Sequence, residues 1–416
     1  MIPVMRPWLG AEEAAAAAAA VSSGWVAQGP RVAEFEAAFA ASIGAGAQPR
    51  ELHGIAVSSC TAALHLALVA AGVGGPGESA HPDGAGARRD SAADEVVVPS
   101  LSFIATANAV RYVGAVPVFA DVDEVTQNLT PQTVAPRLTE RTRAVILVDQ
   151  AGVPADLDAM RALCEPRGIA VVEDAACAAG AVYHGRPVGA GAQLAAFSFH
   201  PRKLLTTGEG GMIVTPDPGA AARLRRLREH GMDVSAAQRH AADQPVIEHY
   251  TEVGFNYRMT DVQAAIGLVQ LGKLDRLVAR RRELAQRYQH LLAGIPGLRT
   301  IADPPWGKTN YQSFWVLLPG GFGVSRDELM RRFAAAGVSA RRGIMAAHLE
   351  PAYGGRNSAL LPVTERLTAS SVILPLFHEL TESEQDVVVS VIRAAAETSN
   401  VTARRRSPGD SLAEAG

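Results

Sequence analysis

Short hydrophobic runs alternate with amphipathic segments across the middle of the chain. Between about residues 55 and 215 the runs are rich in β-branched residues, and stretches with helical spacing separate them. Strands that are continuously apolar are usually buried on both faces, so this alternation predicts an α/β domain with a mostly parallel sheet. The strands are expected at residues 55–57, 96–99, 116–120, 144–148, 170–173, 195–199 and 211–214.

Two further segments divide the chain. Residues 78–93 lie in a polar, glycine-rich stretch that has too few apolar residues to pack, and we expect a flexible surface insertion there. A long helical pattern over residues 261–292 is expected to lead into a C-terminal unit of mixed strands and helices. We therefore predict a large domain over 1–265, a linking helix and small domain over 266–395, and a disordered tail over 396–416.

Composition narrows the class of function. The 416-residue chain carries 42 acidic and 39 basic side chains spread along its length, so no basic stripe suggests a nucleic acid or an anionic membrane as a partner. Its cysteines, Cys60, Cys164 and Cys177, lack the spacing of a metal site or a disulfide framework. No apolar stretch is long enough to span a membrane, and no signal peptide is expected. We expect a cytoplasmic protein that acts on small molecules.

A lysine and an aspartate follow two of the predicted strands, where ligands of α/β sheets bind. Lys203 precedes a glycine-rich turn. A lysine buried there must be paired or have a depressed pKa, and a depressed pKa favours Schiff-base formation with an aldehyde. Asp174 ends a hydrophobic strand, where a buried carboxylate needs a cation such as a protonated pyridine nitrogen. Taken singly, Lys203 is more simply a solvated lysine, and Asp174 can be read as a helix cap.

Three further segments could hold the rest of a phosphorylated aromatic cofactor. Thr61 and Ala62 begin an alanine- and leucine-rich helix whose N-terminus could bind a phosphate, and Ser198 could add a hydroxyl to the same group. Phe103 follows another strand, where its ring could stack on a cofactor. Ordinary helix capping and a core phenylalanine are the plain alternatives.

Together these segments resemble the DegT/DnrJ/EryC1/StrS family of sugar aminotransferases, within fold type I of the pyridoxal-phosphate enzymes. The resemblance is nearly continuous along the chain. Besides the segments around Thr61, Phe103, Asp174 and Lys203, it rests on residues 2–7, 23–30, 121–123, 152–156, 254–267 and 374–378.

This resemblance implies a large domain with a mostly parallel seven-stranded sheet between helices, and a smaller α+β domain. It also implies that Lys203 forms the Schiff base with pyridoxal 5'-phosphate, that Asp174 pairs with the pyridine nitrogen, and that Phe103 stacks on the ring. Thr61, Ala62 and Ser198 would then contact the phosphate. Asn256 resembles the asparagine that reaches the phosphate of the other subunit, which implies a homodimer with shared active sites.

Two departures from the family pattern concern the site and the surface. Cys177 stands where the family often has Gln or His. Because a thiol is a weaker hydrogen-bonding group, the contact that Gln or His makes there is expected to differ in this chain. The insertion at 78–93 interrupts a turn that is compact elsewhere in the family.

Residues on the substrate side are harder to assign from the sequence. Arg341 and His348 lie in a segment that resembles a variant of the family's substrate-side loop, where arginines could meet a nucleotide diphosphate or a carboxylate. A solvated charge cluster is the alternative. Trp25 and His200 are further candidates for contact with the substrate.

The expected reaction moves an amino group from glutamate or glutamine to a keto-sugar. The acceptor expected first is a nucleotide-linked 4-keto-6-deoxyhexose. A keto-cyclitol or a 3-keto sugar remains an alternative acceptor. A dehydratase on the same scaffold is disfavoured because such members usually carry histidine where this chain has Lys203. A binding protein that had lost catalysis would be expected to lack Lys203 or Asp174, and both are present.

Overall fold

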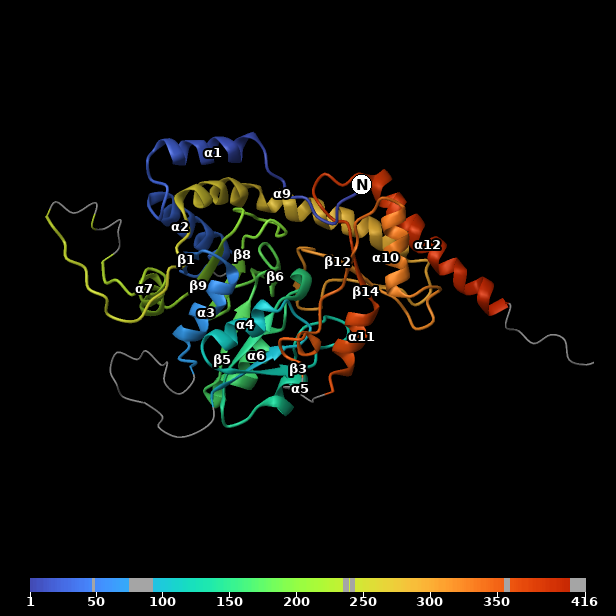
Figure 1. The fold of residues 1–416 in the computed structure, drawn as a ribbon, viewed down its shortest axis with the longest axis horizontal. Coiled ribbons are helices and arrows are strands. Elements are labelled where there is room, and N and C mark those ends of the chain that lie inside the picture. Colours follow the sequence, from blue (N-terminus) through green and yellow to red (C-terminus); the bar gives the residue numbers. More distant parts are fainter. Residues whose placement is uncertain (47–48, 75–92, 235–238, 240–243, 355–359, 405–416) are drawn as a thin grey trace, which may run out of the picture.

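The computed structural model describes residues 1–46, 49–74, 93–234, 239, 244–354 and 360–404. Figure 1 shows a large domain and a small domain side by side, with helix α9 (Asp261–Leu292) lying across both. The expected insertion at 78–93 falls outside the described residues except for its last position. The last helix, α12 (Glu382–Arg404), extends past residue 395, and the remainder of the expected tail lies outside the described residues.

The large domain is built on a seven-stranded sheet in the order β1-β9-β8-β5-β4-β2-β3. Every pairing is parallel except those of β9, which runs antiparallel to both β8 and β1. The expected mostly parallel sheet is therefore confirmed. Its strands are β1 (His53–Val57), β2 (Glu95–Pro99), β3 (Val116–Ala120), β4 (Thr142–Val148), β5 (Ala170–Asp174), β8 (Leu194–Ser198) and β9 (Gly211–Thr215).

Two hydrophobic clusters cover the two faces of this sheet. Successive residues of one strand belong to different clusters, as Val96 and Val97 of β2 do, because side chains alternate along a strand. One face packs against α3 (Cys60–Ala70), α4 (Ala105–Tyr112) and α7 (Pro218–Leu227). The other packs against α2 (Pro30–Gly44), α6 (Leu157–Cys164) and α9.

Short elements complete the large domain around this sheet. A three-stranded sheet in the order β11-β6-β7 joins it to the segment that follows α9. These elements are α5 (Pro131–Val134), β6 (Val182–Tyr183), β7 (Arg186–Pro187) and β11 (Gly307–Lys308).

The small domain packs helices against a four-stranded antiparallel sheet in the order β10-β12-β14-β13. Phe314 and Leu374, which are paired across β12 and β14, are both fully buried. The strands are β10 (Arg299–Thr300), β12 (Phe314–Leu317), β13 (Arg341–Arg342) and β14 (Ser371–Leu374), and the helices are α10 (Arg326–Ala335), α11 (Pro362–Ser370) and α12.

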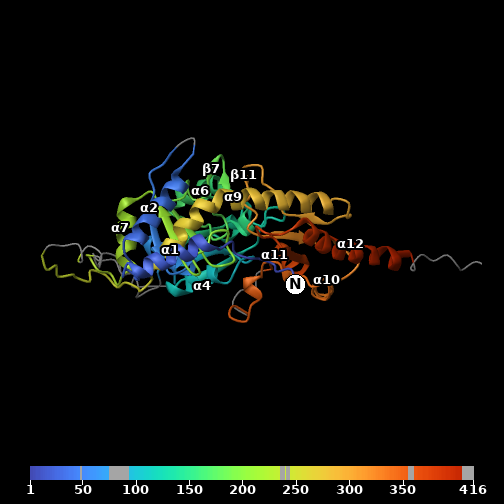
Figure 2. The same ribbon diagram turned by 90° about the horizontal axis from the view of Figure 1, so that it is seen from above.

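The N-terminal segment connects the two domains. Ile2 pairs with Val338 of the small domain, and α1 (Ala11–Ser22) then lies along α9, as Figures 1 and 2 show. Helix α9 begins where sequence periodicity predicted, because Thr260 and Gln263 cap each other's backbone amides at its first turn.

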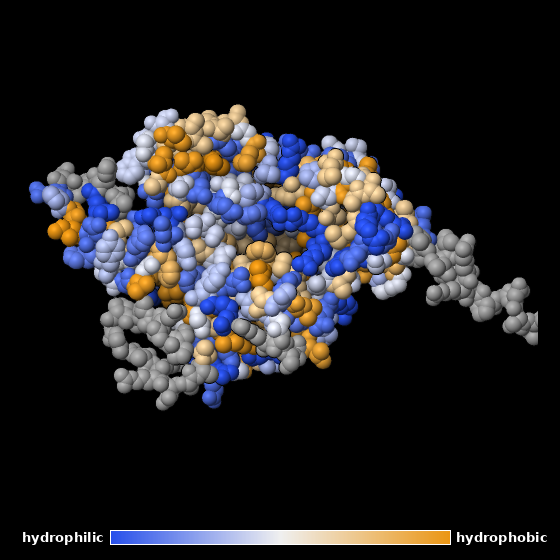
Figure 3. Space-filling model, in the orientation of Figure 1, coloured by the Kyte–Doolittle hydropathy of each residue, from blue (hydrophilic) through white to orange (hydrophobic). Residues whose placement is uncertain are grey.

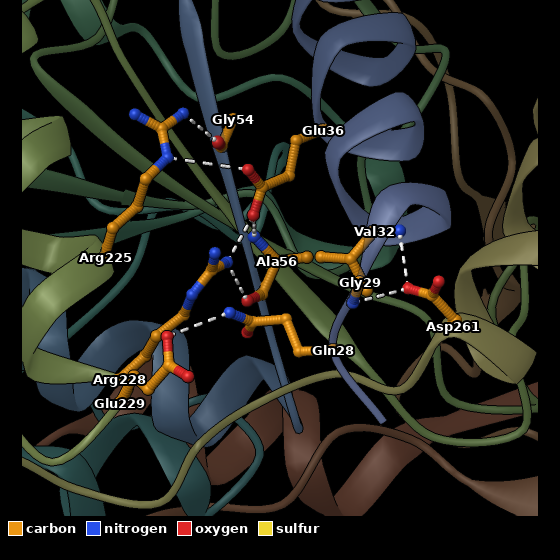
Figure 4. A network of polar contacts seen from close by, with 10 residues as sticks. All are labelled: Gln28, Gly29, Val32, Glu36, Gly54, Ala56, Arg225, Arg228, Glu229 and Asp261. Carbon is orange, nitrogen blue, oxygen red and sulfur yellow. Dashed lines mark hydrogen bonds and ion pairs between the residues drawn. The ribbon is translucent and has the colours of Figure 1, made fainter. Parts of the chain in front are cut away.

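Buried carboxylates hold the N-terminal helices to the sheet. Glu36 of α2 accepts hydrogen bonds from the backbone amide of Ala56 in β1, at 2.9 Å, and from the guanidinium of Arg228. Asp261 at the start of α9 accepts from the amides of Gly29 at 2.8 Å and Val32 at 3.0 Å (Figure 4). Because a buried charge is costly unless it is paired, these contacts fix the positions of α2 and α9 relative to β1.

The outer surface is mixed in polarity. Apolar side chains gather over α1, where Val21 is 57% exposed, and the surface is hollowed between the two domains (Figure 3). No helix within the described residues is both long enough and apolar enough to cross a membrane.

Candidate active site

Lys203 follows β8 and points into the large domain, where its Nζ donates a hydrogen bond to Cys177 Sγ at 3.1 Å. Burial lowers the pKa of Lys203, but attraction to Cys177 and the hydrogen bond to it, followed by attraction to Cys60 and Asp174, outweigh burial and raise the pKa. Lys203 is half-buried and paired, and its pKa is raised, so the expected depressed pKa is not found.

Asp174 lies at the carboxyl end of β5 and is almost fully buried. Its carboxylate accepts a hydrogen bond from Thr106 Oγ1 at 3.0 Å and from the Ala176 amide at 3.2 Å, and Thr106 is in turn 2.8 Å from Ser102 Oγ. Burial raises the pKa of Asp174, while these donors and the nearby Lys203 oppose that shift. The site thus holds a carboxylate that is prepared for a cationic partner.

Helix α3 begins directly beside this pair. Ser59 is its N-cap and accepts a hydrogen bond from the Ala62 amide at 3.1 Å, while the amides of Cys60 and Thr61 have no acceptor inside the helix. A Cβ added to Gly211 of β9 would lie 2.6 Å from the Ser59 carbonyl and 2.7 Å from the Cys60 amide nitrogen. The start of β9 therefore approaches the helix N-terminus at a distance that only glycine permits, and this N-terminus is suited to bind an anion.

The predicted cofactor residues converge on this region. Cys60, one residue before Thr61, interacts electrostatically with Asp174, Lys203 and Cys177, so the start of α3 and the ends of β5 and β8 meet at one point. Ser198 ends β8 as a buried residue.

Phe103 lies at the rim and is 65% exposed. The alternative of a core phenylalanine is therefore wrong. Phe103 shares a pocket of about 100 Å³ with Cys177 and with residues of both domains, which are Gln127, Gln150, Ala151, Ser313, Trp315, Gly343, Ile344, Ser371 and Ile373.

The loop that carries Lys203 is fastened to the segment before β12. Gln312 Oε1 accepts a hydrogen bond from the Leu204 amide at 3.1 Å, and Gln312 Nε2 donates to the Arg202 carbonyl. Both neighbours of Lys203 are thus held by one side chain.

The remaining candidates lie at different distances from this centre. Arg341 is exposed, and burial followed by repulsion from Arg202 lowers its pKa, so these two guanidinium groups lie within electrostatic reach of each other. His200 accepts a hydrogen bond from the Arg202 amide at 3.1 Å through Nδ1. Asn256 is exposed and pairs with Glu229 through its backbone.

Trp25 and His348 both have neighbours inside the chain. The Trp25 ring packs on Gly29, where an added Cβ would lie 2.9 Å from it. His348 is buried, with its Nδ1 2.5 Å from Ser100 Oγ and its Nε2 3.5 Å from Glu365. These contacts favour a structural role for His348, because its ring atoms already have partners inside the chain.

Sequence patterns did not single out three polar residues of the site. Ser59 is the N-cap of α3 and lies two positions before Thr61. The pair Ser58-Ser59 before an apolar helix is the sequence signal that could have identified this cap. Thr106 and Gln312 were missed because each acts on a residue distant in sequence.

A family model for the DegT/DnrJ/EryC1/StrS aminotransferases matches residues 7–393. The chain belongs to this family. Solved structures agree: the aminotransferase TlmJ from Streptoalloteichus hindustanus is 36% identical and covers 97% of this chain and 100% of its own, with a TM-score of 0.81. DesV from S. venezuelae, in complex with a ketimine intermediate, is 35% identical over 93% of this chain and 94% of its own, with a TM-score of 0.79. DesI, in the presence of its TDP-sugar product, is 32% identical over 98% of this chain and 96% of its own, with a TM-score of 0.82.

Membership establishes the cofactor and the reaction class. The protein has the α/β fold of the fold type I pyridoxal-phosphate enzymes and is a pyridoxal-phosphate-dependent aminotransferase of a sugar aminotransferase family. The site fits the cofactor in three respects: a buried carboxylate at Asp174, a half-buried amine at Lys203, and a helix N-terminus with free amides that Gly211 approaches closely.

Proposed function

We propose that this aminotransferase transfers an amino group from glutamate or glutamine to a nucleotide-linked 4-keto-6-deoxyhexose in amino-sugar biosynthesis. The resemblance to DesI, which was solved with a TDP-sugar product, supports a nucleotide-linked acceptor. The guanidinium groups of Arg341 and of Arg202, which adjoins Lys203 in the sequence, support it as well, since arginines bind diphosphates well.

The observation that carries this proposal is the contact of Lys203 with Cys177 beside the buried Asp174. Pyridoxal phosphate, when bound, accepts the amino group from the donor, passes it to the ketone, and stabilises negative charge on the carbon that loses its proton. Asp174 would hold a positive charge at the pyridine nitrogen. The amino group of Lys203 would anchor the cofactor and then move a proton at its Nζ in each half-reaction.

The other residues would position the cofactor. The first-turn amides of α3, near Thr61 and Ala62, would bind the phosphate together with Ser198, while Phe103 would cover one face of the ring. Cys177 would keep contact with Lys203 where relatives often use Gln or His. Trp25 and His200 would lie nearer to the substrate, whereas the contacts of His348 support a structural role.

A homodimer completes this proposal. Asn256 is exposed, and three large apolar residues that precede it are also exposed: Ile247 at 79%, Tyr250 at 62% and Val253 at 76%. Large apolar residues that are exposed within one segment are typical of an interface, and these three precede Asn256 closely in the sequence. Asn256 would then reach the phosphate in the partner subunit.

The test follows the visible absorption of the loaded protein. We expect a band from cofactor bound to lysine, which L-glutamate or L-glutamine bleaches and a thymidine-diphosphate-linked 4-keto-6-deoxyhexose restores. A Lys203→Ala variant should show neither change. If an inosose or a 3-keto sugar restores the band instead, the acceptor is a keto-cyclitol or a 3-keto sugar and the proposed 4-keto-6-deoxyhexose is wrong. Loss of water from the sugar without consumption of an amino donor would indicate a dehydratase.

A further inference from the structure

Two buried residues that line the pocket beside Phe103 carry nitrogen donors without partners. Gln127 is 2% exposed and Trp315 is 3% exposed. Both side chains line the pocket. Within the part of the chain that the structure describes, neither Gln127 Nε2 nor Trp315 Nε1 has a hydrogen-bond partner. A buried polar group in this state costs about 1–3 kcal/mol, so an arrangement with two such groups in one pocket is expected to serve a ligand.

The two residues come from different domains. Trp315 lies on β12 of the small domain, where its backbone pairs with Ile373. Gln127 lies in the loop after β3 and has a positive φ of 62°, a conformation that is uncommon for a residue other than glycine. Its amide donates to the Asp123 carbonyl at 2.9 Å, and this contact helps to hold the strained turn that directs the side chain inward. The strained turn is a second sign that the position serves a purpose.

The chemistry of the pocket selects its ligand. The indole N–H of Trp315 can only donate, whereas the carboxamide of Gln127 can donate and accept, so a hydroxyl group can satisfy both. No residue that lines the pocket is charged, and its other walls include Phe103, Ile344 and Ile373. A carboxylate would lack a counter-ion there. The volume of about 100 Å³ suits one small substituent of a larger molecule.

The position of the pocket connects it to the reacting group. Cys177 lines the pocket and is also the residue whose Sγ lies 3.1 Å from Lys203 Nζ. A group held between Gln127 and Trp315 therefore lies one side chain away from the amine.

We propose that Gln127 and Trp315 bind a neutral ring hydroxyl of the keto-sugar acceptor and so select among acceptors. This inference rests on the proposed function. It assigns no contact to the amino donor, because the carboxylates of glutamate need cations that this pocket does not contain.

Kinetics of the two half-reactions test the proposal. The variants are Gln127→Met, which keeps an unbranched side chain, and Trp315→Phe. With a thymidine-diphosphate-linked 4-keto-6-deoxyhexose we expect kcat/KM for the second half-reaction to fall about 10- to 100-fold in each. The first half-reaction with L-glutamate should remain as in the wild type. Trp306→Phe is the matched control, because the Trp306 indole donates to the Pro154 carbonyl at 2.9 Å and does not line the pocket.

Acceptors that lack the hydroxyl at C2 or at C3 identify the group that is bound. The wild type should use one of them about tenfold less well, and both pocket variants should lose that preference. Equal losses in both half-reactions, or an unchanged preference, would overturn the proposal. If the wild type itself converts no keto-sugar, the proposed function fails and this inference fails with it.

Nuclear magnetic resonance gives a readout besides activity. The chain has four tryptophans, so the signal that Trp315→Phe removes from the indole N–H spectrum belongs to Trp315. In the loaded wild type this signal should shift when the keto-sugar is added and stay in place with L-glutamate or L-glutamine. A shift with either amino acid would assign the pocket to the donor instead. If Trp315→Phe does not fold, the half-reaction kinetics of Gln127→Met still test the proposal.

Discussion

Lys203 Nζ and Cys177 Sγ, which lie 3.1 Å apart, form the pair at the centre of the site. Attraction to Cys177 is the largest of the effects that raise the pKa of Lys203 against burial. In Cys177→Ala burial remains and this attraction is lost, so the pKa of Lys203 should fall. We expect the cofactor-free variant to capture pyridoxal phosphate faster at neutral pH, since more of the amine is neutral. Stopped-flow absorbance across a pH series measures this, and Cys177→Ser should lie in between. An identical pH dependence in all three proteins would contradict the pairing.

Thr106 donates a hydrogen bond to Asp174, the proposed partner of the pyridine nitrogen. Its hydroxyl donates to the carboxylate at 3.0 Å, so in Thr106→Val the pKa of Asp174 should rise further and the carboxylate should be lost at higher pH. We expect kcat to fall about tenfold and the acid limb of the pH profile to move to higher pH. Ser102→Ala, which removes the hydroxyl 2.8 Å from Thr106 Oγ1, should produce a smaller shift in the same direction. A lower kcat with an unmoved acid limb would indicate a packing defect instead.

Gly211 tests the helix N-terminus as the phosphate site. A Cβ at this position would meet the Ser59 carbonyl and the Cys60 amide at under 3 Å, so Gly211→Ala should push the first turn of α3 away from β9. We expect the affinity for pyridoxal phosphate, measured by equilibrium dialysis, to fall about tenfold or more, because the anion loses aligned amide donors. Gly272→Ala in α9 is the control, since a Cβ there meets nothing within 4 Å. Equal affinities in the two variants would place the phosphate elsewhere.

The ion pair between Glu36 and Arg228 should dominate the attachment of α2. Both residues are less than a tenth exposed, and Glu36→Gln would leave the buried guanidinium without its charge partner. The free energy of unfolding in urea should drop by about 3–5 kcal/mol. Arg31→Ala removes the exposed pair with Glu34 and should cost less than about 1 kcal/mol. A small loss in Glu36→Gln would show that the pair is replaceable.

His65 introduces an acid sensitivity into α3. Burial lowers its pKa from 6.5 to about 4, and its Nδ1 lies 3.0 Å from the Tyr257 hydroxyl. The folded state therefore binds fewer protons than the unfolded state between these pH values. Its contribution to stability should be complete above pH 6.5 and should be lost as the pH falls towards about 4. Melting temperatures of wild type and His65→Phe over this range should diverge if His65 carries the effect, and parallel curves would exclude it.

Much of the large sheet could be predicted from the sequence because its strands are buried on both faces. The strand at 116–120 was predicted with its observed bounds, whereas β2 and β4 each begin earlier, at Glu95 and Thr142. Those two polar residues interrupt the apolar pattern, yet both are buried in the fold. Hydrophobic periodicity predicts the apolar interior of a strand, but it misses a polar residue at the end of a strand that is buried through contacts with other residues.

Hydrophobic periodicity could not predict the direction of β9 or the residues that support the site. β9 runs antiparallel to β8, the strand before it, and to β1, which lies more than 150 positions away. Thr106 and Asp174 are 68 positions apart, and Gln312 is 108 positions from Leu204. Such contacts become visible only when the chain is folded, since neither residue has a local signature.

The hydrogen bonds from Gln312 connect the small domain to the loop that carries Lys203. Gln312 leads into β12 and holds the backbone on both sides of Lys203. A rotation of the small domain that displaced Gln312 would carry the amine with it. If the small domain rotated during turnover, the release of a product would therefore be coupled to the position of this nitrogen.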